Sequence, residues 1–168
     1  MYQIISFTKH WTEIYAPIVE NCPARGKSFH CIESIANIAN LSMKLPTLPS
    51  PFVALETNIG GDISDKFFAP QYNLYFFVRA EQKAGYDTDL DDAQAKESAM
   101  ECAMDYINYL REQKEQHEND RMFPLLGIDT DNVHFETFGP IHNRWFAVGI
   151  SFIDKARFSR CVDKSKYK

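Results

Sequence analysis

His134 and Glu136 are the residues whose types and spacing come closest to a chemical site. One residue separates them, so on a strand both side chains would point to the same face. His142 follows in the next predicted loop, and the three side chains together could ligate a metal ion. Their spacing matches neither HxH nor HExxH. We therefore favour the alternative, in which His134 and Glu136 lie on the solvated face of a strand.

Other segments give weaker chemical signals. Residues 87–92 and 129–132 contain clustered aspartates, but both lack the glycine and glutamate of an EF-hand calcium loop. Gly60 and Gly61 belong to no phosphate-binding motif, and no GxSxG sequence occurs. The cysteines occur singly, without a CxxC pair: Cys22, Cys31, Cys102 and Cys161. The sequence therefore predicts no enzyme activity, no bound metal and no cofactor.

Composition and charge fit one globular domain. The chain has 168 residues, and its hydrophobic fraction of 45% can form a core of ordinary size. A net charge of −5 argues against an extended nucleic-acid surface, which requires clustered basic residues. No apolar run is long enough to span a bilayer, and the first residues do not resemble a secretory signal. We expect neither nucleic acid nor a membrane as a partner.

Two helices are predicted early in the chain. Apolar residues at spacings of three and four indicate a helix over residues 8–21, and Pro17 should kink or end it near Ala16. Ser28 is a plausible N-cap for a second helix over residues 29–43.

The longest predicted helix follows the acidic residues 87–92. Asp91 and Gln94 resemble a capping box at its start. Its polar continuation, residues 111–121, is predicted to protrude into solvent as a frayed helix or loop.

Four strands are predicted from alternating apolar residues. They span residues 52–59, 72–80, 132–138 and 145–153, and the last two form a hairpin through a loop at 139–144. The order α-α-β-β-α-β-β predicts an α+β fold, with a sheet of about four mainly antiparallel strands and the long helix on one face. Residues 1–153 would form one domain, and the basic residues 154–168 a flexible tail.

The strand at 72–80 is apolar on both faces, which exceeds what one layer of helices can cover. We interpret the second face as a surface that another subunit covers. This interpretation favours a structural role over a catalytic one.

The arrangement resembles the tail-terminator, or tail-completion, proteins of long-tailed bacteriophages and prophages. The similar segments are residues 48–55, 73–78, 92–95 and 145–152, within a resemblance that covers about residues 5–153. The polar extension at 111–121 and the basic tail depart from the usual pattern.

The resemblance implies a ring-forming subunit, typically in a hexamer, that caps the tail tube and contacts other tail or connector proteins. The protein would be found in the bacterial cytoplasm during assembly and then in the virion tail. Residues proposed for the contacts are Asp62, Asp65, Phe67, Phe68, Tyr75, Phe77, Ile141, His142 and Arg144. Two alternatives remain: a small non-catalytic protein-binding module, and an enzyme with a pocket between helix and sheet.

Overall fold

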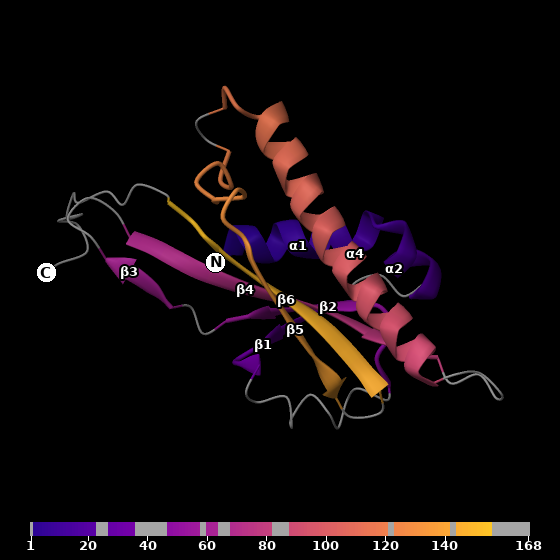
Figure 1. Cartoon of the computed structure of the whole chain (residues 1–168). Helices are drawn as coiled ribbons and strands as arrows, with labels where there is room; N and C mark the ends of the chain where they lie inside the picture. Colours follow the sequence, from indigo (N-terminus) through magenta and orange to yellow (C-terminus); the bar gives the residue numbers. More distant parts are fainter. Residues whose placement is uncertain are drawn as a thin grey trace, which may run out of the picture.

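A mixed β-sheet with helices on one face forms the fold (Figure 1). The computed structural model describes residues 2–22, 27–35, 47–57, 60–63, 68–81, 88–120, 123–141 and 144–155. The predicted α+β class is confirmed.

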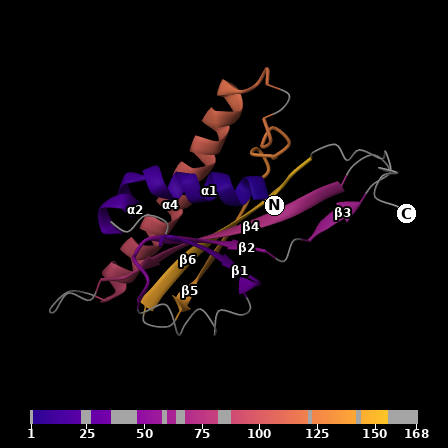
Figure 2. The same ribbon diagram turned by 180° about the vertical axis from the view of Figure 1, so that it is seen from behind.

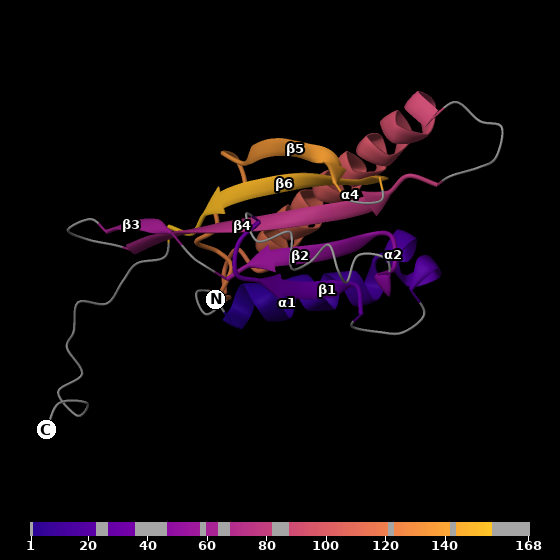
Figure 3. The same cartoon turned by 90° about the horizontal axis from the view of Figure 1, so that it is seen from below.

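The strands are β1 (Phe29–Ile32), β2 (Phe52–Glu56), β3 (Gly61–Ile63), β4 (Phe68–Arg79), β5 (His134–Ile141) and β6 (Trp145–Ile153). Their order across the sheet is β1-β2-β4-β6-β5, and only the β1–β2 pair is parallel. The short β3 pairs with the first residues of β4. These two segments project from one end of the sheet as a two-stranded arm (Figure 3).

The helices are α1 (Tyr2–Ile14), α2 (Ala16–Asn21) and α4 (Thr88–Gln116). The predicted break near Ala16 is confirmed: Pro17 lies in the first turn of α2, and Tyr15 between the helices is extended. Figure 2 shows α1 and α2 crossing α4. A buried hydrogen bond of 2.9 Å joins Thr8 of α1 to Tyr106 of α4.

The predicted helix over residues 29–43 is wrong where the structure describes it. Residues 29–32 form β1, and the Ser28 carbonyl accepts a hydrogen bond from the amide of Val53 in β2. Phe29 packs against the helix-side core and Ile32 against the opposite core. Side chains in this segment therefore point to alternate faces of the sheet, as in a strand, and not to one side of a helix. Residues 36–46 lie outside the described part.

Two predictions about the long helix also need correction. The helix begins at Thr88, so Asp91 lies within its first turn and does not cap it. The polar segment 111–121 does not protrude freely, because α4 continues to Gln116. Two basic side chains of this segment also bind backbone carbonyls of the loop that precedes β5. Arg111 donates to the carbonyl oxygen of Thr130 (2.6 Å), and Lys114 donates to that of Ile128.

The predicted strands are all found, with shifted ends. The arm lengthens β4, and β5 runs into the predicted 139–144 loop as far as Ile141. Beyond β6, Asp154 and Lys155 still belong to the fold, because their amides bond the carbonyls of Pro70 and Gly127. The remainder of the predicted basic tail lies outside the described residues.

The central strands of the sheet are buried on both faces. On one face Val53, Leu74 and Phe76 contribute to the large core beneath α1 and α4. On the opposite face, called here the second face, Phe52 and Trp145 belong to a smaller core.

The interpretation that another subunit must cover the second face is therefore wrong for its central residues. Tyr75 is 6% exposed and Phe77 is fully buried within the single chain. The chain itself provides the cover, because Ile35, Leu48 and Phe138 pack against this core.

Candidate functional site

A row of polar side chains crosses the second face at the end nearest the arm. Glu56, Asn73, Ser151 and His134 are successive cross-strand neighbours on β2, β4, β6 and β5. Asn73 donates to Glu56 Oε2 (2.9 Å), and Ser151 Oγ donates to Asn73 Oδ1 (2.7 Å). Glu56, Asn73 and Ser151 thus form a hydrogen-bonded chain across β2, β4 and β6.

Glu56 is the buried end of this row. The carboxylate also accepts a hydrogen bond from the Tyr75 hydroxyl (3.0 Å). Burial, followed by this bond to Glu56, raises the pKa of Tyr75 well above its ordinary value. Tyr75 therefore acts as a neutral donor that holds the carboxylate in place.

The exposed end of the row carries the residues that suggested a metal site. His134 lies opposite Ser151, and Glu136 lies opposite Gly149. His142 lies outside the described residues. Among the residues that are described, no group of three or more His, Cys, Asp or Glu side chains could hold a metal ion.

Ser151 and His134 of the polar row do not form a nucleophile–base pair. The Ser151 hydroxyl is directed to Asn73 rather than to His134. Burial raises the pKa of Cys102 to about 11 and also raises that of Cys31, so both thiols favour their protonated, unreactive form.

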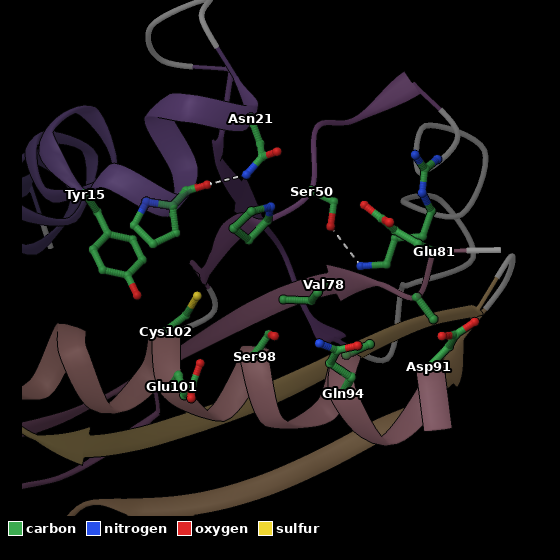
Figure 4. A pocket seen from close by; sticks show the side chains of 15 residues that line it. Tyr15, Asn21, Ser50, Val78, Glu81, Asp91, Gln94, Ser98, Glu101 and Cys102 are labelled. Carbon is green, nitrogen blue, oxygen red and sulfur yellow. Dashed lines mark hydrogen bonds between the residues drawn. The ribbon is translucent and has the colours of Figure 1, made fainter. Parts of the chain in front are cut away.

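An open cavity of about 410 Å³ lies between α2, the start of α4 and the end of β4 (Figure 4). Tyr15 lies on one wall, facing Cys102 and Glu101 of α4, and its hydroxyl donates to Asp105 (2.8 Å). Asp91 and Glu101 line the α4 side. Carboxylates outnumber cations around this cavity.

The proposed contact residues are scattered. Asp62 and Phe68 lie on the β3–β4 arm, whereas Asp65, Phe67 and His142 lie outside the described residues. Tyr75 and Phe77 are buried in the second face, as described above. Ile141 packs against the same core and is half-buried.

Arg144 is committed to contacts within the chain. Its guanidinium pairs with Asp92 and donates to the Thr88 carbonyl (2.9 Å), which fixes the β5–β6 turn to the start of α4. Its role as a contact residue stays a prediction.

Both edges of the sheet, β1 and β5, have no strand on their outer side among the described residues. Edge strands carry unsatisfied backbone donors and acceptors that can pair with another chain. Sequence reasoning identified β5 as a strand but missed β1, so it could not locate the pair of edges. The four residues of β1 give too short a pattern to reveal the strand from sequence alone.

No protein-family model matches this sequence, and no significant match to a curated protein was found. No described helix is long and apolar enough to cross a lipid bilayer.

Proposed function

We propose that this chain is a structural assembly subunit that forms a closed ring, in the manner of the phage and prophage tail-terminator proteins that it resembles. The observation that carries the proposal is that neither β1 nor β5 has a further strand on its outer side in the part of the chain that the structure describes. In this setting the protein assembles in the bacterial cytoplasm and becomes part of a virion tail.

The direction of the strands supports head-to-tail contact. β1 is parallel to β2, and each later step across the sheet, from β2 to β4, β6 and β5, is antiparallel. β5 therefore runs opposite to β1, so β5 of one copy can meet β1 of the next as an ordinary antiparallel neighbour. A repeated contact of this kind, between two different surfaces, closes into a ring when its rotation permits.

The β3–β4 arm supports contact with other tail or connector proteins. It extends beyond the main sheet, away from the edges used for the ring (Figure 3). A ring subunit requires such a second surface, because its lateral edges are occupied by its neighbours.

Native mass spectrometry and negative-stain electron microscopy of the purified protein over a range of concentrations test this proposal. We expect one closed oligomer of defined mass and ring shape. A protein that stays monomeric at every concentration, or that forms only open chains, contradicts it.

The acidic cavity favours a second candidate function, the binding of a basic segment of another protein. Asp91 and Glu101 would pair with lysine or arginine side chains there. Calorimetric titration with an oligolysine peptide tests this candidate. Binding should be lost in the Asp91→Asn, Glu101→Gln double variant; equal binding by both proteins would reject the cavity as the site.

A further inference from the structure

The backbone groups available at the β5 edge follow from bonds elsewhere in the sheet. Two backbone hydrogen bonds mark the ends of the β4–β6 pair. The amide of Asp154 donates to the carbonyl oxygen of Pro70 (2.9 Å), and the amide of Ala80 donates to that of Arg144 (3.0 Å). Hydrogen-bonded positions alternate along an antiparallel pair. The even-numbered residues of β6 therefore direct their backbone N–H and C=O groups toward β4, and the odd-numbered residues direct theirs toward β5. The amide of Asp129 donates to the carbonyl oxygen of Ile153 on the β5 side, as this alternation requires for an odd-numbered residue.

The same alternation continues into β5. Glu136 lies opposite Gly149, and Phe138 lies opposite Ala147, so these β5 residues bond inward to β6. Their odd-numbered neighbours, Phe135 and Thr137, therefore direct their N–H and C=O groups outward. Beyond them the register shifts between Phe138 and Ile141, which ends the regular edge.

The β1 edge has a matching pair of outward residues. The carbonyl oxygens of Ser28 and Ile32 accept hydrogen bonds from the amides of Val53 and Thr57, each at 2.7 Å. The even-numbered residues of β1 therefore direct their backbone groups toward β2. Phe29 and Cys31 accordingly direct their backbone groups away from the sheet.

We infer that β5 of one copy pairs with β1 of the next, with Phe135 opposite Cys31 and Thr137 opposite Phe29. The inference rests on the proposed ring and names its contact surface, a second copy of this chain. Among antiparallel registers, this one uses all four outward residues, in two reciprocal pairs of backbone hydrogen bonds.

The side chains agree with this register. Odd-numbered residues lie on the helix side in both strands: Phe29 and Phe135 each pack against the helix-side core. The faces of the two sheets are therefore continuous across the junction. On the second face, Glu136 lies directly opposite His30 of the next copy, whose Nε2 is hydrogen-bonded to the Lys27 carbonyl oxygen of its own chain (2.9 Å).

Engineered disulfides test the register. In antiparallel strands, residues opposite each other at a position without backbone bonds have Cα atoms about 4.5 Å apart, within the range of about 4.4–6.8 Å that a disulfide requires. The test protein carries His30→Cys and Glu136→Cys. It also carries Cys31→Ser, which removes an exposed thiol, and Cys161→Ser, at a cysteine outside the described residues. The matched control replaces Glu136→Cys by Thr137→Cys, which lies on the opposite face of the strand.

On mild oxidation we expect the test protein to give a ladder of covalent multimers on a non-reducing gel, ending at the ring size, and the control to give none. A disulfide-linked dimer from Glu136→Cys without His30→Cys would show β5 pairing with β5 and overturn the inference. A ring seen by native mass spectrometry without a disulfide ladder would overturn the inference but leave the proposed function standing. A monomer under all conditions would contradict both.

Discussion

At the level of single residues, one buried hydroxyl pair connects α1 to α4. Thr8 and Tyr106 are both fully buried and hydrogen-bonded to each other. Tyr106→Phe would leave the Thr8 hydroxyl without this partner, which costs about 1–3 kcal/mol of unfolding free energy. Urea denaturation measures the loss.

Two further variants identify the cause of that loss. Thr8→Val added to Tyr106→Phe removes the orphaned hydroxyl and should recover part of the stability. Tyr109→Phe should have little effect, because Tyr109 is only half-buried. If Tyr106→Phe is as stable as the wild type, the bond does not hold the helices together.

Asp129 is a second residue whose contribution can be isolated. A hydrogen bond from Lys155, then one from Asn132, lowers the pKa of its carboxyl below the ordinary value. A lowered pKa in the folded state adds stability above the unfolded pKa of about 4, and this stability is lost as pH falls through the folded value.

Asp129→Asn should therefore be less stable than the wild type at neutral pH, and the difference should shrink as pH falls below about 4. Chemical denaturation at a series of pH values measures it. A difference that is independent of pH would assign the effect to the side-chain amide rather than to the charge.

At the level of elements, proline substitutions distinguish the two sides of β5. Thr137→Pro removes an outward N–H, a position where edge strands accept proline, so the fold should remain. Glu136→Pro removes an inward bond to β6 and should destabilise the protein. Thermal unfolding and native mass spectrometry together should show Thr137→Pro folded but monomeric. A Thr137→Pro protein that still assembles would argue against the edge contact.

The sequence predicted the elements whose own pattern determines them. The break at Pro17 follows from the missing amide, and β6 follows from its alternating apolar residues. It failed at β1, where four residues are too short for a periodicity argument and pairing with β2 decides the structure. It also failed at Arg111 and Lys114, because their carbonyl partners lie in a distant loop.

The candidate site was only partly predictable for the same reason. His134 and Glu136 were found on one strand face, as their spacing indicates. Their neighbours in the polar row, Glu56 and Asn73, come from strands far apart in sequence, and only the register of the sheet brings them together.

At the level of the whole molecule, the decisive feature is that the chain itself covers both faces of the central strands, whereas no strand among the described residues lies outside β1 or β5. Apolar burial therefore does not require a second copy, and contact between copies depends on backbone pairing and the arm. Such a contact buries little apolar surface, so a single junction should be weak and the closed ring should form cooperatively.

Hydrogen exchange of individual β5 amides tests the edge contact most directly, because neighbouring residues provide an internal control. We predict that the amides of Phe135 and Thr137 exchange rapidly in dilute protein and become protected at concentrations where the ring forms, together with those of Phe29 and Cys31. The Glu136 amide, bonded to β6, should be protected throughout. Rapid exchange at Phe135 and Thr137 in an assembled ring would contradict the account.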